Sequence, residues 1–199
     1  MKIFFQKIPH EVRDIALFGL AGLVLALVLS LIRPLEYSST VRLLVLQKNV
    51  PVDAYTAIKA IETITENLSE IVYTSSFFDR ALAADTRIDR NQFSPIEQKR
   101  RKQWSRAVST QLSRGSGFFS VTVYNRDKHE ATRIVTAIAN VLKDAGWEYV
   151  NSQIELKMVD TPLESRFPVR PNVAVNALMG LVLGAMVGGG YMSYTSKNS

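Results

Sequence analysis

Two long apolar stretches, one near each end of the chain, dominate its pattern of hydrophobic and polar positions. Residues 15–32 are eighteen consecutive uncharged positions, and residues 173–192 are twenty. At a rise of 1.5 Å per residue, such stretches make helices of roughly 27–30 Å, close to the hydrocarbon thickness of a bilayer. We therefore expect transmembrane helices at 15–32 and 173–192. A cleaved signal peptide is the alternative for the first stretch, but no small-x-small cleavage site precedes Arg33-Pro34.

The basic residues in the short flanks of these stretches predict how the chain is oriented. They lie in the flank at 1–14 and in the tail at 193–199, and they are Lys2, Lys7, Arg13 and Lys197. Because basic flanks stay in the cytoplasm, we expect a multi-pass inner-membrane protein with both termini cytoplasmic. Residues 33–160 then form a domain outside the cytoplasm. Arg166 and Arg170 lie at the outer end of the second stretch, so the orientation depends mainly on the first.

Small residues recur on one face of each predicted membrane helix. Gly180, Gly184 and Gly188 are four residues apart, and Gly22 and Ala26 repeat the same spacing in the first helix. A face without large side chains lets a neighbouring helix backbone come close, so we expect a helix–helix contact there. The alternative is that these glycines reflect only the ordinary composition of membrane helices.

Between the two apolar stretches, four short runs have the alternation and the β-branched and aromatic content of strands. These runs occupy residues 38–46, 107–112, 118–124 and 154–159. In the first run, Val41, Leu43 and Val45 share one face. Arg114-Gly115-Ser116-Gly117 separates the second run from the third, which predicts a hairpin. The first and last strands continue directly toward the membrane helices, so we expect them side by side.

Helical periodicity occupies the rest of the central segment. Residues 53–84 predict a long helix whose apolar positions alternate at spacings of three and four, which fits either a helix lying on a sheet or, less favoured, an interface between chains. Ser94-Pro95 predicts an N-cap followed by proline at the first position of another helix. Asp127 and Glu130 are spaced as a capping box at the start of a third helix. The buried stripe expected on that helix is Ala131, Ile134, Val135, Ile138, Val141, Leu142 and Ala145. The order of elements predicts a small α+β domain with a mixed or antiparallel sheet and a long helix.

Three prolines, Pro162, Pro168 and Pro171, precede the second apolar stretch. Proline fixes its own φ and forces the residue before it out of the helical region. We therefore expect residues 161–172 to be a stiff, non-helical segment between the domain and the second membrane helix.

The net charge of +6 is dispersed, except for a basic run at Lys99, Arg100, Arg101 and Lys102. This run is either a patch for an anionic ligand, such as a glycan, a phospholipid headgroup or nucleic acid, or a solvated helix face. The solvated face is the favoured interpretation. Nucleic acid fits least, because the predicted orientation places the run outside the cytoplasm.

Residues that would carry catalysis or bind a cofactor are sparse in this sequence. The chain has no cysteine, and its two histidines, His10 and His129, have no sequence neighbours that suggest a metal site or a catalytic pair. It contains no phosphate-binding loop, no GxSxG motif and no HExxH motif. We therefore expect no enzyme activity, no cofactor and no metal.

Taken together, several segments resemble the chain-length determinant (Wzz-type) family of polysaccharide co-polymerases, in its compact capsule-type form. The resemblance begins with Glu36-Tyr37-Ser38 after the first membrane helix, and it ends with the three prolines before a glycine-rich second helix. Its most specific part is the run 119–140, FSVTVYNRDKHEATRIVTAIAN. Residues 53–103 carry little of the family pattern.

This resemblance implies a membrane scaffold whose copies form a ring beside a membrane polymerase and its lipid-linked glycan. Such a protein regulates the chain length or export of O-antigen, capsule or exopolysaccharide. Its expected partners are other copies of itself, membrane lipids and the polymerase, with a separate tyrosine kinase as a further partner and no nucleic acid. The alternatives from other classes are an adaptor that activates that kinase, an extracytoplasmic ligand sensor, and a membrane-anchored enzyme.

Overall fold

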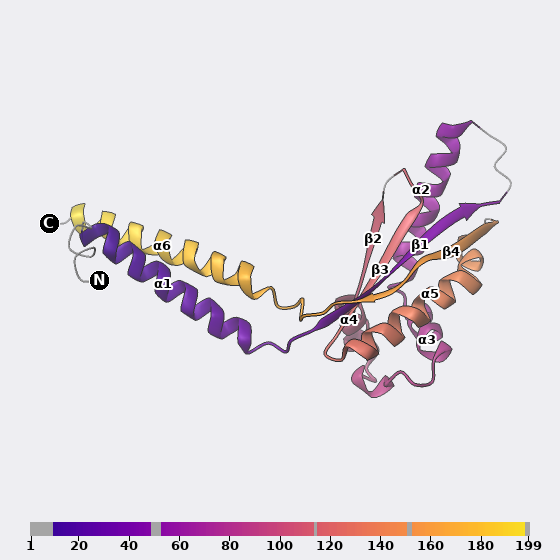
Figure 1. Cartoon of the computed structure of the whole chain (residues 1–199), viewed down its shortest axis with the longest axis horizontal. Coiled ribbons are helices and arrows are strands. Elements are labelled where there is room, and N and C mark those ends of the chain that lie inside the picture. Colours follow the sequence, from indigo (N-terminus) through magenta and orange to yellow (C-terminus); the bar gives the residue numbers. More distant parts are fainter. Residues whose placement is uncertain (1–9, 49–52, 114, 151–152, 198–199) are drawn as a thin grey trace. The chain divides into compact units, whose positions relative to one another are not determined.

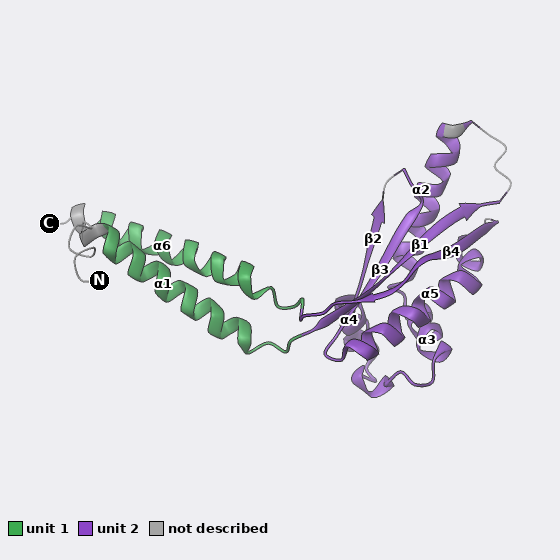
Figure 2. Cartoon of the chain, viewed as in Figure 1, with its two compact units in different colours: residues 1–35, 169–199 green, residues 36–168 purple. Residues whose placement is uncertain are grey.

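The structure, a computed structural model, describes residues 10–48, 53–113, 115–150 and 153–197. Lys2 and Lys7 of the basic flank, the expected strand break at Pro51 and Val52, and Arg114 of the hairpin lie outside the described residues. The chain divides into two compact units, residues 1–35 with 169–199 and residues 36–168 (Figure 2). The predicted α+β class is confirmed, because two long apolar helices at the ends flank a four-stranded antiparallel sheet with helices.

The first unit is a pair of helices, α1 (His10–Leu31) and α6 (Val173–Lys197), packed against each other (Figure 1). Both are long and apolar enough to cross a membrane, over Val12–Leu31 and Val173–Tyr194. Helix α1 begins five residues before the predicted span. Large apolar side chains such as Leu29 and Met186 are exposed on the outside of the pair. Such a surface is unfavourable in water and suits lipid, which supports a membrane location.

The second unit is built on a sheet in the order β2-β3-β1-β4. Its strands are β1 (Tyr37–Gln47), β2 (Val108–Ser113), β3 (Phe118–Asn125) and β4 (Ile154–Glu164), and every pair is antiparallel. The first and last strands are neighbours, as expected. Gly115 and Gly117, both at positive φ, turn the chain between β2 and β3 and confirm the predicted hairpin.

The core lies on one face of the sheet, under the long helix α5 (Lys128–Val150). Val41, Leu43 and Val45 are buried on that face, and Val121 and Phe119 of β3 pair with the first two. Every residue of the stripe expected on α5 is buried. Helix α5 contacts β4, β1 and β3. The apolar side chains at every second position of the strands therefore pack against the apolar stripe that recurs every 3.6 residues on the helix.

The predicted long helix is wrong in one respect, because the structure has two helices there, α2 (Ala54–Ile71) and α3 (Ser75–Ala84). Thr74 is the reason for the break. Its hydroxyl donates to the carbonyl of Ile71 at 2.7 Å and accepts from the amide of Phe77 at 3.3 Å, so it ends one helix and caps the next. Helix α2 packs on α5 and the sheet, which is the interpretation favoured over a chain interface.

Two predicted helix starts also differ from the structure. Helix α4 spans Glu97–Ala107 and has Ile96 as its N-cap, because the hydroxyl of Ser94 accepts from the amide of Ile96 in a turn before the helix. A short 3₁₀ helix, η2 (Arg90–Gln92), lies between α3 and α4. The predicted capping box does not form, although Asp127 still caps the helix. Asp127 accepts from the amide of His129, but the Glu130 carboxylate accepts from the amide of Asp89 at 2.8 Å.

The proline-rich segment is shorter than predicted, because Pro162 lies inside β4. The register between β1 and β4 shifts at this point, so that Thr161 and Pro162 lie between two successive paired positions of the ladder. Strand β4 is an edge of the sheet. An edge strand with a bulge is the place in a sheet that tolerates a residue without an N–H. The non-helical connection to α6 therefore begins after Glu164 and contains Pro168 and Pro171.

Candidate functional site

The small-residue faces of the two apolar helices meet each other within one chain. A Cβ atom added at Gly22 would collide with the carbonyl oxygen of Gly180 and lie 3.0 Å from the Cα of Gly184. A Cβ atom added at Gly184 would collide with the carbonyl oxygen of Phe18. Backbone therefore lies directly on backbone at these positions, which only glycine permits.

The same contact extends in both directions along the pair. A Cβ atom at Gly180 would collide with the side chain of Ala26, and one at Gly188 would lie 2.9 Å from the Cβ of Phe18. At the C-terminal end of α1 and the N-terminal end of α6, the Asn176 amide donates to the hydroxyl of Ser30 at 3.0 Å, and Ser30 is 3% exposed. A hydrogen bond between apolar helices adds specificity to a contact made chiefly by van der Waals packing.

The partner of the glycine face is thus the other apolar helix of the same chain. The helix-packing residues predicted from the sequence, Gly22, Ala26, Gly180, Gly184 and Gly188, all lie at this contact. The prolines form no comparable site. Pro162 is in β4, and Pro168 and Pro171 are in the connection that follows, where the Arg170–Pro171 bond is cis.

The basic run of α4 does not form one continuous patch. Lys99, Arg101 and Lys102 are exposed, while the Arg100 side chain is only 25% exposed. Arg101 donates to Glu97 and to the hydroxyl of Ser75, and Ser75 in turn donates to Glu97. The hydrogen bonds that Glu97 accepts from Arg101 and from Ser75 hold the pKa of its carboxyl below its usual range. Lys99 and Lys102 make no polar side-chain contact with any residue that the structure describes. The favoured solvated-face interpretation therefore describes these three residues and not Arg100.

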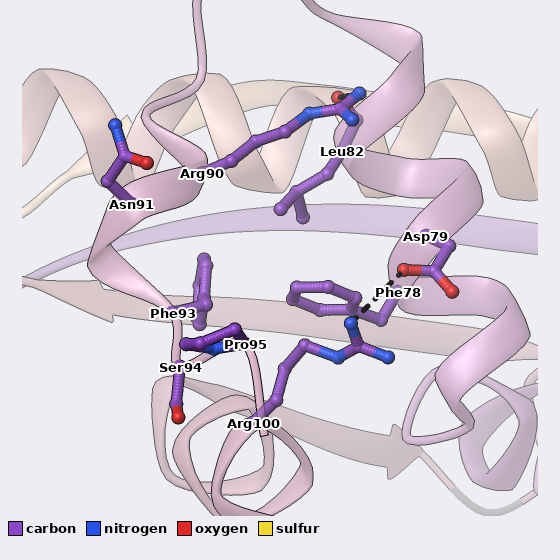
Figure 3. A pocket seen from close by; sticks show the side chains of 9 residues that line it. All are labelled: Phe78, Asp79, Leu82, Arg90, Asn91, Phe93, Ser94, Pro95 and Arg100. Carbon is purple, nitrogen blue, oxygen red and sulfur yellow. Dashed lines mark hydrogen bonds and ion pairs between the residues drawn. The ribbon is translucent and has the colours of Figure 1, made fainter. Parts of the chain in front are cut away.

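Arg100 reaches a cavity of about 540 Å³ between α3, η2 and α4 (Figure 3). The floor of the cavity is apolar and includes Phe78, Phe93 and Pro95, and its polar side chains include Arg90, Asn91 and Arg100. Figure 3 shows the aromatic and prolyl rings between the two arginine side chains. This is the combination of apolar floor and few polar groups that small-molecule sites use.

A buried aromatic cluster makes this floor rigid. The rings of Phe78 and Phe93 meet edge to face at 5.1 Å, and Phe78 meets Trp104 in the same way at 5.0 Å. Trp104 is 1% exposed, and its indole N–H donates to the carbonyl of Val72 at 2.7 Å. Edge-to-face pairs add stability beyond their buried area, so the cluster fixes α3, α4 and the η2 segment relative to one another.

A second cavity, of about 780 Å³, is lined by arginine and carboxylate side chains in equal number. Its central group, Glu130, is 7% exposed and accepts from the Asp89 amide, from Gln92 and from Arg133 at 2.8–3.0 Å. These donors satisfy the Glu130 carboxylate and tie the η2 segment to α5. We therefore assign this cavity a structural role.

The sequence interpretation missed the cavity beside α4 because its residues come from three separate segments. Trp104, which lies two residues after the basic run, was the one available signal. Among the residues that the structure describes, no three histidine, cysteine or carboxylate residues are grouped as metal ligands. No protein-family model and no curated protein matches this chain.

Proposed function

We propose that this chain is a membrane scaffold that assembles with further copies of itself and regulates the chain length or export of a surface polysaccharide. In this proposal both termini are cytoplasmic, the α+β unit lies outside the cytoplasm, and a membrane polymerase elongates the glycan beside it. The chain acts by position and by assembly, and it performs no reaction on the glycan itself.

The observation that carries the proposal is that the N-terminal and C-terminal parts of the chain pair with each other, both as helices and as strands. Helices α1 and α6 pack through glycine, and the strands that follow α1 and precede α6 along the chain, β1 and β4, are hydrogen-bonded neighbours in one sheet. One unit is therefore anchored by two helices whose contact is inside the chain. This leaves the outward sides of the helices and the surface of the α+β unit for contacts between copies.

The resemblance to chain-length determinant proteins supplies the polysaccharide part of the proposal. The run 119–140 of that resemblance includes most of β3 and the buried stripe of α5 as far as Ile138, so its pattern reflects the packing of one helix on the sheet. The two features that mark its other end, prolines followed by a glycine-rich helix, correspond to the bulged edge strand and the backbone contact with α1.

The test is the ladder of surface polysaccharide from the source strain with and without this protein. Deletion should change the distribution of polysaccharide chain lengths seen as bands on a gel. The same protein expressed from a plasmid should restore the original distribution. A deletion strain with an unchanged ladder would refute the function. A deletion strain that lacks the polymerised repeat unit altogether would favour an enzyme.

A further inference from the structure

We propose that the cavity beside α4 binds an acidic sugar unit, with the Arg100 guanidinium pairing with its carboxylate. This inference rests on the proposed function for the kind of polymer involved, and it adds the place of contact and the chemical class of the sugar. It concerns the face of the α+β unit shown in Figure 3.

Arg100 carries the argument because its hydrogen-bonding capacity is unused. Its side chain makes no hydrogen bond with any residue that the structure describes, and its nearest acid, Asp79, is 3.9 Å away. Its guanidinium instead lies over the ring of Phe78, with its Cζ 5.1 Å from the ring centroid. A guanidinium held on an aromatic face offers its fork of N–H donors to a planar anion in a fixed direction.

The other arginine of the cavity and the next one along α4 differ from Arg100. Arg90 donates to the carbonyl of Leu82 at 3.0 Å, and Arg101 donates to Ser75 and Glu97. The side chains of Arg90 and Arg101 therefore already have hydrogen-bond acceptors within the chain. Only Arg100 is positioned by packing while its donors stay available, and this is the arrangement expected of a residue that binds a ligand.

The floor of the cavity suits a sugar ring. Phe78 and Phe93 meet edge to face and are held from behind by Trp104, and the exposed Pro95 lies beside them, so C–H groups of a pyranose can pack against ring edges and the proline ring. The Asn91 amide, which has no side-chain hydrogen bond with the described residues, supplies both a donor and an acceptor for hydroxyl groups at the Arg90 end. The volume of about 540 Å³ accommodates a short saccharide.

The charge of the cavity favours an acidic sugar over a neutral one. The lining of the cavity includes two arginines, Arg90 and Arg100, and a single acid, Asp79. The Asp79 side chain is 63% exposed and lies at the distance of a weak ion pair from Arg100, so a ligand carboxylate can replace it. Removing Asp79 should therefore strengthen binding, while removing the Arg100 charge should weaken it.

The experiment titrates the full-length protein in lipid nanodiscs with two matched probes, followed by ligand-observed NMR. The probes are the α-1,4-linked trimer of galacturonic acid and its carboxyl-reduced galactose counterpart. The acidic trimer should bind saturably, and the neutral trimer should bind about tenfold more weakly, because a hydrogen bond to a charged group is lost. R100Q should bind the acidic trimer about tenfold more weakly, and D79N about threefold more tightly.

K102Q is the control, since it makes the same change of charge on the same helix at an exposed side chain. It should bind the acidic trimer as the unmodified protein does. Equal binding of the two trimers, or equal binding by R100Q and the unmodified protein, would overturn the proposal, and so would the absence of binding. The gain expected for D79N cannot come from misfolding, so it separates a ligand contact from a general loss of structure.

The polysaccharide ladder of the deletion strain tests the proposed function separately from the proposed sugar site. A changed ladder together with no binding of the acidic trimer would overturn the cavity site and leave the scaffold function standing. Binding that depends on Arg100 together with an unchanged ladder would support the site and refute the function.

Discussion

At the scale of single residues, the fold depends on a few side chains that satisfy the backbone of another element. Trp104 is the clearest case. It fills the space between α3 and α4, and its indole N–H donates to the Val72 carbonyl at the end of α2. Thr74 and Glu130 act in the same way at the break between α2 and α3 and at the start of α5. Such residues connect neighbouring elements, and the hydrophobic pattern of each element does not predict these connections.

Trp104→Phe should lower the free energy of unfolding by about 1–3 kcal/mol, since it leaves a buried carbonyl without its donor and reduces the volume of the cluster. Trp147→Phe is the matched control, because Trp147 is 56% exposed and a surface substitution stays within about 0.5 kcal/mol. Urea unfolding of the full-length protein in detergent, followed by circular dichroism, measures both. Equal losses for the two variants would contradict the assigned role of Trp104.

Acid should destabilise the protein through its hydrogen-bonded carboxylates. The side chain and the amide of Arg87 both donate to Asp85 and lower the pKa of its carboxyl from the ordinary 3.8 to about 2. Asp53 also has a lowered pKa, caused first by the amide of Thr56. A carboxyl whose pKa is lower in the folded state contributes stability above its ordinary pKa and loses that stability as the pH falls through the folded value.

The midpoint of thermal unfolding should therefore be steady near neutral pH and fall as the pH goes from about 4 to about 2. Asp85→Asn should reduce the size of this fall, because asparagine does not titrate. Circular dichroism melts of the two proteins across this range provide the measurement. An identical pH dependence for both would show that the Asp85 pair does not contribute.

At the scale of elements, the pairing of α1 and α6 is the feature that most needs a direct test. The chain has no cysteine, so a single engineered pair reports one contact. A Cβ atom at Gly19 lies 3.7 Å from the Cβ of Ala185, which is within the range that a disulfide bridges. Gly19→Cys with Ala185→Cys should therefore form a disulfide inside one chain, seen as a shift in mobility without a dimer band. A disulfide that forms only between chains would contradict the pairing.

Gly184→Leu in this cysteine background should slow formation of the disulfide about fivefold or more, since such contacts are worth on the order of 1 kcal/mol in membranes. Even alanine should slow it, because its methyl would meet the backbone of Phe18 and Gly19. Leu183→Ala is the control, as Leu183 is exposed on another side of α6. Equal rates for Gly184→Leu and Leu183→Ala would show that the glycine face is not under packing constraint.

The elements themselves were largely predictable from the sequence, while their ends were not. Alternation in β1 and β3 and the stripe of α5 follow directly from burial on one side, so these predictions were correct. The break at Thr74 and the late start of α4 depend on side-chain hydrogen bonds that compete with helix formation. Pro162 was expected to end the strand, but a bulge at the sheet edge accommodates it.

The cavity beside α4 was beyond the reach of sequence patterns for a different reason. Its ligand-facing group, Arg100, is one of four adjacent basic residues, and nothing along the chain separates it from the other three. The difference appears only when Phe78 of α3 lies under its guanidinium. The glycine spacing, in contrast, predicted a close helix contact, but not that the partner is the helix at the other end of the same chain.

At the scale of the whole molecule, the proposed function requires that the α+β unit lie outside the cytoplasm. Reporter fusions should place Ser199 in the cytoplasm and Asn91, which lies in the α+β unit, on the outer side. The reason is the basic flank before α1 and the even number of membrane crossings. An Asn91 reporter that is active only in the cytoplasm would contradict this orientation and, with it, the contact between the unit and a surface glycan.

A scaffold and an enzyme differ in what their loss changes, and this difference tests the central claim most directly. The measurement is size-exclusion chromatography of the polysaccharide from cells and medium together, with total repeat-unit sugar determined on the same sample, in the source strain and its deletion. A regulatory scaffold predicts a shifted or broadened distribution of chain lengths while the total polymerised sugar changes little. An unaltered distribution of chain lengths would contradict the account. So would a loss of total polymerised sugar that reduces chains of every length by the same factor.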